Sequence, residues 1–216
     1  MAHALPIVPL PVSWRGIKRK RSEISPREGS GADERDRCLM DRVRTGDEEA
    51  FRQLFDTYWE PLVGYAAMII GAGDDCEDVA LQAFVRVWRH RTKWAGNGAV
   101  RPYLYRITRN LALNARRDRL VRDARQRTTQ LIEGDANHHR TPAQHLEAAC
   151  LRREVRVAID LLPERRRDAF VLSRFHGLSH HEIADTLGIS SQTVANHLSA
   201  AMADLRITLA HHLTDA

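Results

Sequence analysis

Uncharged side chains that can form hydrogen bonds gather near the C-terminal end of this 216-residue chain. They lie in one short stretch, which also holds a histidine: Ser190, Ser191, Gln192, Thr193, Asn196, His197 and Ser199. Amides and hydroxyls of this kind can meet base edges and phosphates when a helix carries them into the major groove of duplex DNA. The chemistry expected of this stretch is therefore recognition by hydrogen bonding, not bond making.

The sequence around this stretch has the pattern of a helix-turn-helix: GLSHHEIADTLGISSQTVANHLSAAMADLR, from Gly177 to Arg206. Ser179 and Glu182 have the spacing of a capping box at the start of the first helix. Gly188 permits a left-handed backbone at the turn, and Ser190 can cap the second helix. The same spacing occurs in helical bundles that bind no DNA, so a generic helical hairpin is the alternative interpretation.

A second group of functional side chains falls in a helix predicted from Arg101 to Leu120. Positions 100° apart place apolar residues on one side and a mainly basic set on the other: Arg106, Arg109, Asn110, Leu113, Arg116 and Arg117. The aromatic residues Trp94, Tyr103 and Tyr105 are near in sequence. Cations suit phosphates and aromatic rings suit unstacked bases, which is what single-stranded nucleic acid requires. A solvated arginine face beside core aromatics is the equally open alternative.

Helical periodicity begins at Leu39, and Asp47 can cap a helix that Pro61 is expected to interrupt. A third helix is predicted from Asp75 to about His90, with acidic residues in its first turn. Its apolar residues fall on two sides, with one set formed by Val79, Ala83 and Val87 and the other by Leu81, Phe84, Val85 and Trp88. This exceeds what one small core needs, so the helix is either central or docks on a partner.

Composition gives a weaker indication of the partner. Lys and Arg total 33 against 28 Asp and Glu, a formal charge of +5 whose sign favours a polyanion. Cys38, Cys76 and Cys150 form no CxxC pair, so buried thiols in a reducing cytosol are expected instead of disulfides. No apolar run reaches the roughly 20 residues of a membrane span, so we expect a cytoplasmic protein without membrane insertion.

Catalysis is the least favoured class of function. His181 and Glu182 begin an HExxH-like run, but Asp185 stands where the second zinc-binding histidine would be. Further histidines, His138, His139 and His145, and Cys150 lack regular ligand spacing. The sequence also has neither a phosphate-binding glycine loop nor a GxSxG motif. We expect no enzyme activity, no cofactor and no metal site.

The chain is expected to be all-α, with two small helical domains. Residues 1–36 mix prolines, glycines and charges and are predicted to be a disordered basic tail. A first helical domain is predicted over 37–120, a polar linker over 121–145, and a second helical domain over 146–213. In the second domain Pro163 is expected to begin the helix before the helix-turn-helix.

Three stretches of the first domain, together with the downstream helix-turn-helix, carry a family resemblance. They are GDEEAFRQLFDTYWEPLVGYA at 46–66, DDCEDVALQAFVRVWRH at 74–90 and RPYLYRITRNLALNARR at 101–117. The chain resembles bacterial RNA polymerase sigma factors of the sigma-70 family, of the extracytoplasmic-function (ECF) type, over 39–120 and 146–209. This resemblance implies a sigma region 2-like four-helix domain and a sigma region 4-like helix-turn-helix domain, joined by a flexible linker.

The resemblance also implies partners and site residues. The third helix would bind the β′ clamp helices of core RNA polymerase through Asp75, Asp78, Leu81, Gln82, Val85 and Arg86. The minus-ten promoter element would be captured as a single strand, with a flipped base, by Trp94, Asn97, Tyr103, Arg106, Arg109, Asn110, Asn114, Arg116 and Arg117. The minus-thirty-five element would be read as duplex by Ser190, Ser191, Gln192, Thr193, Asn196, His197 and Ser199. The β flap and an anti-sigma factor are further implied partners.

Two departures from the family pattern concern the strength of these contacts. Leu81 and Gln82 stand where the family usually has Gln and an acid, and Ala195 and Ala200 stand where it often has Lys or Arg. Two rival functions remain: a stand-alone helix-turn-helix regulator of duplex DNA, and a pure interaction protein that binds polymerase or an anti-sigma factor. The basic helix at 101–117 argues against the first, because a sensor domain does not need a strand-capturing face.

Overall fold

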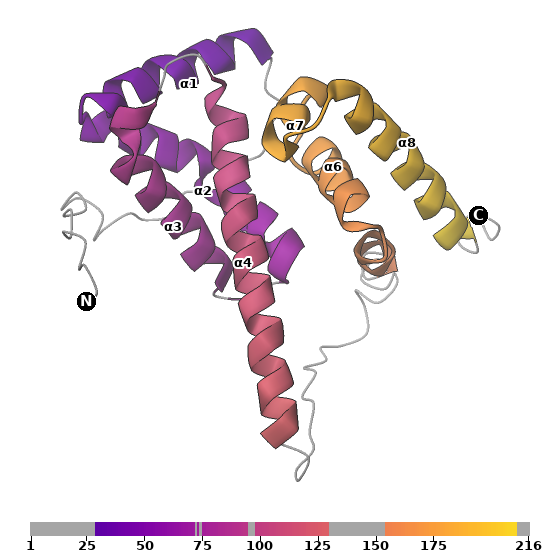
Figure 1. Ribbon diagram of the computed structural model, residues 1–216. Helices are drawn as coiled ribbons and strands as arrows, with labels where there is room; N and C mark the ends of the chain where they lie inside the picture. The colour runs from indigo at the N-terminus through magenta and orange to yellow at the C-terminus, as the bar shows by residue number, and fades with distance from the viewer. Residues whose placement is uncertain (1–28, 72, 74, 95–97, 130–153, 211–216) are drawn as a thin grey trace, which may run out of the picture. The chain divides into compact units, whose positions relative to one another are not determined.

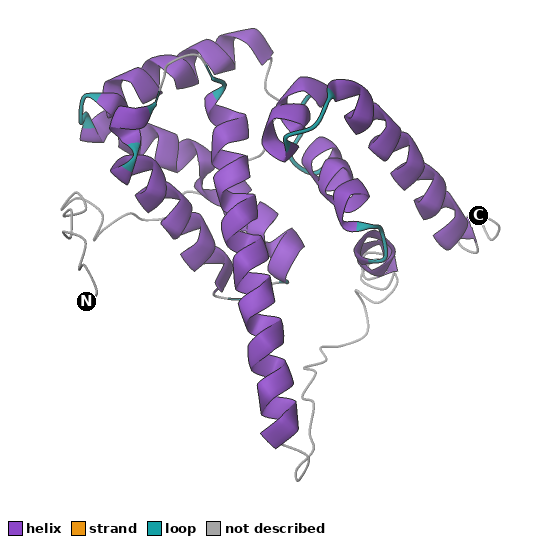
Figure 2. Cartoon of the chain, viewed as in Figure 1, coloured by secondary structure: helices purple, strands orange, loops and turns teal. Residues whose placement is uncertain are grey.

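The computed structural model describes residues 29–71, 73, 75–94, 98–129 and 154–210 (Figure 1). The described residues form helices joined by short loops, with no strand among them (Figure 2). In chain order the elements are α1 (Gly29–Arg44), α2 (Glu48–Ile70), α3 (Asp75–Arg89), the 3-10 helix η2 (Arg91–Lys93), α4 (Val100–Thr129), α6 (Glu164–Arg174), α7 (His180–Leu187) and α8 (Ser191–Thr208). Residues 154–160 are also helical. The all-α prediction is confirmed.

The chain divides into two compact units, residues 1–115 and 116–216. The boundary falls inside α4, which begins in the first unit. Two helical units were expected from the sequence, and each is described here by itself. None of the helices that the structure describes is long and apolar enough to cross a membrane.

The first unit is built on the packing of α2 against α1 and α3. Aromatic rings fill this interior: Phe55 and Phe84 lie with ring centroids 4.8 Å apart, and Phe51 lies 4.9 Å from Trp88. The start of α2 is fixed by Asp47, whose carboxylate accepts from the backbone N–H of Ala50 at 3.0 Å. That hydrogen bond, helped by the Arg42 guanidinium, lowers the pKa of the Asp47 carboxyl. The predicted cap is confirmed.

Two segment boundaries differ from those predicted around α1 and α2. Residues 29–36 were assigned to a disordered tail, but α1 already begins at Gly29, because Asp36 and Leu39 belong to one buried helical stripe. Pro61 was expected to restart the chain, yet it lies inside a continuous α2. Proline removes one backbone donor, and buried residues on both sides, Tyr58 and Leu62, keep the helix in place.

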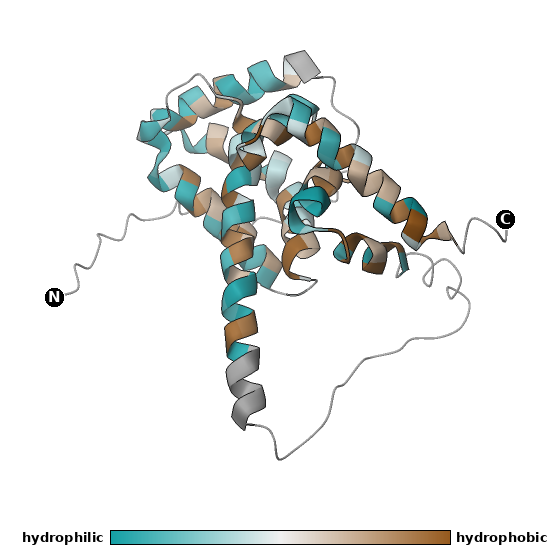
Figure 3. Cartoon of the chain, turned by 45° about the vertical axis from the view of Figure 1, so that its right-hand side comes forward, coloured by the Kyte–Doolittle hydropathy of each residue, from teal (hydrophilic) through white to brown (hydrophobic). Residues whose placement is uncertain are grey.

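The fourth helix is longer than predicted. It was expected to end at Leu120 and to lead into a linker from residue 121, whereas α4 continues to Thr129. The added segment has no glycine or proline and is rich in arginine, a good helix former, so nothing in it stops the helix. Apolar and hydrophilic residues alternate along α4, as expected for a helix with one buried side (Figure 3). The remaining linker, 130–145, lies outside the described residues.

The second unit holds the helix-turn-helix in the predicted form. The Ser179 side chain accepts from the backbone N–H of Glu182 at 3.3 Å, and the Glu182 carboxylate accepts from the Ser179 N–H at 2.7 Å. Gly188 has φ +67°, a left-handed conformation that favours glycine. Ser190 caps α8 by accepting from the backbone N–H of Thr193 at 3.1 Å. The capping box, the turn and the second cap are confirmed.

Three consecutive arginines near the start of α6 connect it to three neighbours. Arg165 donates to the carbonyl of Leu187 at the end of α7 at 3.2 Å. Arg166 pairs with Asp204 of α8 at 2.7 Å. Arg167 donates to the carbonyl of Asp160, at the end of the preceding helical segment, at 3.1 Å. Cations at helix C-termini are favourable because the last carbonyls lack helical partners. These arginines therefore hold the unit together.

Candidate nucleic-acid and protein interfaces

The first half of α8 presents an uncharged polar face. Ser191, Gln192, Asn196 and Ser199 are exposed, while Val194 and Ala201 are buried on the opposite side. The Gln192 amide donates to the Asn196 amide oxygen at 3.2 Å, so the two side chains lie together one turn apart. Thr193 and His197 are half-buried at the edges of this face, as are Ala195 and Ala200. The face can hydrogen-bond to base edges, but its exposed residues include no cation.

The exposed side of α4 has a different composition. Arg106, Asn110, Asn114 and Arg117 are exposed and follow one another at helical spacing of three or four residues. Tyr103 begins the same row, half-buried. Guanidinium and amide groups along one helix face offer phosphates and bases both charge and hydrogen bonds. This row retains most of the predicted minus-ten residues.

Two of the predicted arginines do not lie on that row. Arg109 is only 8% exposed, because it follows the buried Tyr105 by one turn on the core-facing side of α4. Arg109 is therefore not part of the exposed row, and its contact with DNA stays a prediction. Arg116 is half-buried and also stands off the exposed row. Tyr105, placed near the strand-binding face by sequence, packs on Tyr65 in the core with centroids 5.2 Å apart.

Trp94 and Tyr103 bring an aromatic cluster to the beginning of this row. Trp94 directly follows η2, and its ring centroid lies 5.2 Å from that of Tyr103 on α4. The Arg106 guanidinium in turn lies 5.8 Å from the Tyr103 ring centroid, one turn further along the helix. Aromatic surface and a cation therefore meet at one point of the first unit. Asn97, the remaining member of the predicted set, lies outside the described residues.

The exposed stripe of α3 contains the predicted polymerase-binding polar residues. Asp75, Asp78, Gln82 and Arg86 are exposed along one side of the helix, and Leu81 and Val85 beside them are half-buried. The second apolar face expected on this helix is smaller than predicted. Phe84 and Trp88, which were assigned to it, are buried among the rings of α2. Only Leu81 and Val85 are left to give the stripe an apolar flank.

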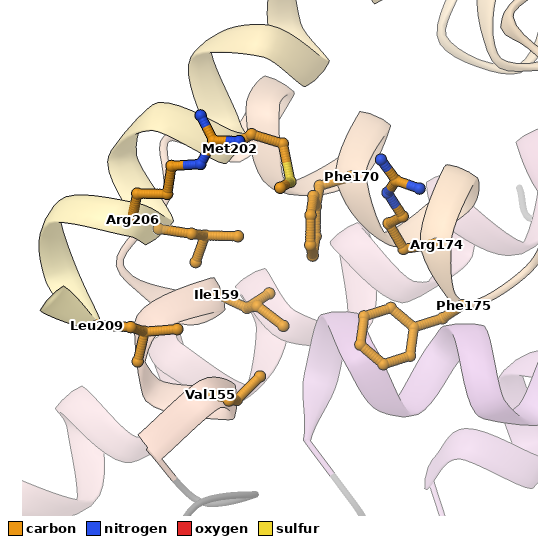
Figure 4. Close-up of a pocket in the computed structure, with 9 residues that line it drawn as sticks. Val155, Ile159, Phe170, Arg174, Phe175, Met202, Arg206 and Leu209 are labelled. Carbon is orange, nitrogen blue, oxygen red and sulfur yellow. The ribbon is translucent and has the colours of Figure 1, made fainter. Parts of the chain in front are cut away.

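An apolar groove in the second unit was not anticipated from the sequence. Its volume is about 420 Å³, and side chains from residues 154–160, α6 and α8 line it: Val155, Ile159, Phe170, Phe175, Met202 and Leu209 (Figure 4). Arg174 and Arg206 stand at its rim, and Phe175 is 47% exposed. The signal that could have indicated it is Phe175, an aromatic residue just past the end of α6 where a solvated loop needs none.

The cysteines were expected to be buried thiols. Cys76 is buried and donates to the carbonyl of Gly71 at 3.0 Å, but Cys38 is exposed on α1, because the buried stripe of that helix passes through Leu39 and Met40 instead. Cys150, His138, His139 and His145 lie outside the described residues.

Two family models match the chain, one in each unit. The model described as Sigma-70 region 2 matches residues 54–120, and Sigma-70, region 4 matches residues 152–205. The first range covers α3, Trp94 and the exposed row of α4, and the second covers the helix-turn-helix. The matched ranges thus contain the surfaces described above, whereas α1 lies outside both.

Similar whole proteins are also known. RNA polymerase sigma-H factor of Pseudomonas aeruginosa is 31% identical over 176 residues, 78% of this chain and 90% of that protein. ECF RNA polymerase sigma factor SigE of Mycolicibacterium smegmatis is 30% identical over 176 residues, which are 79% of this chain and 67% of that protein. Among solved structures, CnrH in complex with the cytosolic domain of CnrY has a TM-score of 0.64 at 24% identity, covering 82% of this chain and 98% of that one. At that identity the structural likeness shows a shared fold.

Proposed function

The chain belongs to the sigma-70 family of RNA polymerase sigma factors, of the ECF type, and we propose that its two units share the work of promoter recognition unequally. The first unit captures the minus-ten element as a single strand and carries the main contact with core polymerase. The second unit reads the minus-thirty-five element as duplex. The chain is thus a transcription initiation factor that acts through binding, and no bond is made or broken by its own residues.

The exposed row of α4 is the observation that carries this proposal. Arg106, Asn110, Asn114 and Arg117 follow one another on the solvent side of the helix, and this row includes no acidic residue. Each guanidinium can neutralise a phosphate, and each amide can pair with a base edge. The row therefore suits a strand laid along the helix axis.

Trp94 and Tyr103 supply the aromatic surface for an unstacked base. Extruding a base from the duplex costs a few kcal/mol. Stacking on an aromatic ring contributes about 1–3 kcal/mol per base, which is enough to offset that cost when phosphate contacts are added. The contact between the Tyr103 ring and Arg106 brings stacking and phosphate neutralisation within one helical turn.

The polar face of α8 is assigned to the minus-thirty-five element. Ser191, Gln192, Asn196 and Ser199 would reach base edges, with Ser190, Thr193 and His197 beside them at the helix N-terminus. A bidentate amide contact to adenine contributes about 1–3 kcal/mol of discrimination. The face lacks the cations that dominate affinity for duplex DNA, so recognition there is specific but weak.

The exposed stripe of α3 is assigned to the β′ clamp helices of core polymerase. Asp75 and Asp78 supply negative charge, Gln82 and Arg86 supply hydrogen bonds, and Leu81 with Val85 supplies a narrow apolar flank. The departure at Leu81 exchanges one polar contact of the family pattern for apolar surface. Docking through this stripe is therefore expected to be less sensitive to salt than docking through a fully charged helix.

Protein partners are also expected at the second unit. We assign the groove lined by Phe170 and Phe175 to an apolar helix of the β flap, with Arg174 and Arg206 pairing with acids on that helix. An anti-sigma factor is a further partner. A solved sigma factor of this fold, RpoE, is in complex with the anti-sigma factor NepR from Bartonella quintana, at a TM-score of 0.56 and 23% identity over 74% of this chain and 96% of that one.

Run-off transcription tests the proposal. Genomic promoter fragments are transcribed with core polymerase alone, with the full chain alone and with both together, and a transcript of defined start is expected only with both. Duplex binding by the full chain alone is measured in parallel and is expected to be weak. Tight, specific duplex binding by the isolated chain, without any polymerase-dependent transcript, would establish the stand-alone regulator instead.

A further inference from the structure

Helix α1 brings a carboxylate into the interior of the first unit. Its buried side consists of Asp36, Leu39, Met40 and Val43, and Asp36 is only 2% exposed. Burying an ionisable carboxyl group is unfavourable unless it finds hydrogen-bond donors. An apolar residue at this position would have served packing equally well. The presence of Asp36 therefore points to a role that packing alone does not explain.

Tyr58 of α2 supplies a donor to this carboxylate. Its hydroxyl donates to the Oδ2 atom of Asp36, and Tyr58 itself is 2% exposed, so the hydrogen bond lies inside the unit. Apolar contacts between two helices tolerate a shift along the axis, whereas one buried polar pair is satisfied in a single register. The Asp36–Tyr58 hydrogen bond thus fixes where α1 lies along α2.

The register of α1 matters because α1 also packs against η2. The 3-10 helix η2 is also tied to the end of α3, where the Arg91 guanidinium donates to the carbonyl of Trp88 at 2.9 Å and lies 4.4 Å from the Trp88 ring centroid. Trp94 is the next residue after η2, and its backbone N–H donates to the backbone carbonyl of Arg91 at 3.2 Å. A displacement of α1 would therefore free one side of the element that carries Trp94.

We propose that Asp36 and Tyr58 are positioning residues for strand capture. Their hydrogen bond holds α1 in the register that supports η2, and η2 holds the Trp94 ring against Tyr103, the residue whose ring contacts Arg106. Neither Asp36 nor Tyr58 touches DNA. This inference rests on the proposed role of Trp94 and Arg106 in binding the minus-ten strand. It adds a support of which α1, with Asp36, lies outside the matched family ranges.

The test uses the full chain carrying Tyr58→Phe, assembled with core polymerase. Three affinities are measured: for core polymerase, for a minus-thirty-five duplex, and for a single-stranded minus-ten oligonucleotide taken from the promoter found by run-off transcription. We expect the affinity for the single strand to fall about five-fold and the other two to stay unchanged, a size typical of coupling through packed elements. The matched control is Glu34→Gln, which breaks the exposed Glu34–Arg37 ion pair on the same helix and should change none of the three.

Asp36→Asn separates positioning from simple stability. The amide oxygen that this substitution introduces can still accept from the Tyr58 hydroxyl, so strand affinity is expected to remain close to that of the unmodified protein. All measurements are made at a temperature where circular dichroism shows every variant fully folded. Equal losses of all three affinities in Tyr58→Phe, or no loss at all, would overturn the inference. If the unmodified holoenzyme does not bind the oligonucleotide, strand capture by α4 is itself wrong, and the inference falls with it.

Discussion

The exposed faces of α4 and α8 offer nucleic acid two different chemistries. On α4, Arg106 and Arg117 flank Asn110 and Asn114, so charge and hydrogen bonding are combined. On the first half of α8, the exposed side chains are hydroxyls and amides. Affinity for nucleic acid comes largely from phosphate neutralisation, and specificity comes from base edges. The comparison teaches that the more recognisable DNA-binding motif need not carry the larger exposed charge, and on the proposed roles we expect it to be the weaker binder.

The unit that holds the helix-turn-helix is not short of arginine, but three consecutive arginines of α6 have another use. Arg165, Arg166 and Arg167 reach α7, α8 and the preceding helical segment, so their charges stabilise helix ends and helix packing. A guanidinium that already donates to a carbonyl is not available to a phosphate without breaking that bond. Formal charge therefore overstates the attraction of this unit for DNA.

The largest expected effect comes from removing the exposed charges of α4. Replacing both arginines, Arg106→Ala with Arg117→Ala, should reduce open-complex formation by about 100-fold at low salt, because two phosphate contacts are lost. Each lost contact should also reduce the slope of the salt dependence by about 0.7 for a single strand. Promoter melting is monitored by permanganate reactivity at several salt concentrations, which gives both the extent of open-complex formation and the salt slope. The control is Arg44→Ala with Arg52→Ala, which removes the same charge from exposed positions on α1 and α2. Equal losses in both pairs would mean that only net charge matters.

The next effect distinguishes the buried arginine from its exposed neighbour. Arg109→Ala should lower the free energy of unfolding by about 2 kcal/mol, since it leaves a cavity and breaks interactions in a nearly buried site. Arg106→Ala should change it by no more than about 0.5 kcal/mol, as expected for a surface position. Urea denaturation followed by tryptophan fluorescence measures both. A silent Arg109→Ala combined with a loss of promoter melting would return Arg109 to the DNA-binding row.

Arg109 also illustrates what sequence periodicity can and cannot decide. The 100° spacing predicts one apolar, inward side for this helix, and Leu104, Ile107 and Thr108 are indeed buried. Arg109 stands at the edge of that side, where the width of the neighbouring helices determines burial. Those helices are distant in sequence; Tyr65 of α2, for example, packs on Tyr105, which lies one turn before Arg109. Local pattern therefore predicts the centre of a face better than its edges.

Local signals were most reliable where the physics is local. The capping box at Ser179, the cap at Asp47 and the turn at Gly188 depend on a few adjacent residues, and all three are confirmed. The contacts of the α6 arginines depend on residues far apart in sequence, so no motif indicates them, and Phe175 alone points to the apolar groove. Asp36 was missed for the same reason, because its partner Tyr58 is on another helix.

A smaller effect is expected from the polar face of α8. Gln192→Ala with Asn196→Ala should weaken minus-thirty-five binding by the holoenzyme about ten-fold, within the range for lost base-edge contacts. The salt dependence should stay unchanged, since no phosphate contact is removed. Ile207→Ala, at an exposed position near the end of the same helix, is the control. A change in the salt slope equal to that of the α4 variants would contradict the division between the two faces.

The smallest effect separates the two units by the chemistry of their helix caps. Asp47 caps α2 with a carboxylate whose pKa is lowered, first by the Ala50 N–H and then by Arg42, whereas Ser190 caps α8 with a hydroxyl that does not titrate. The pKa of Asp47 is lower in the folded protein than its ordinary value of 3.8. Its contribution to the free energy of unfolding is therefore complete above pH 3.8 and disappears as the pH falls through the lower folded value. Asp47→Asn keeps a capping oxygen without that dependence.

The fluorescence midpoint for urea unfolding reports the first unit, because all four tryptophans, Trp14, Trp59, Trp88 and Trp94, fall within residues 1–115. The difference in midpoint between the unmodified protein and Asp47→Asn should therefore shrink on acidification below pH 3.8. The difference in urea midpoint between the unmodified protein and Ser190→Ala, measured by circular dichroism, should not change over the same pH range. A difference for Asp47→Asn that stays constant with pH would show that the carboxylate caps α2 without any preference for its charged form, and the contrast between the caps would then rest on geometry alone.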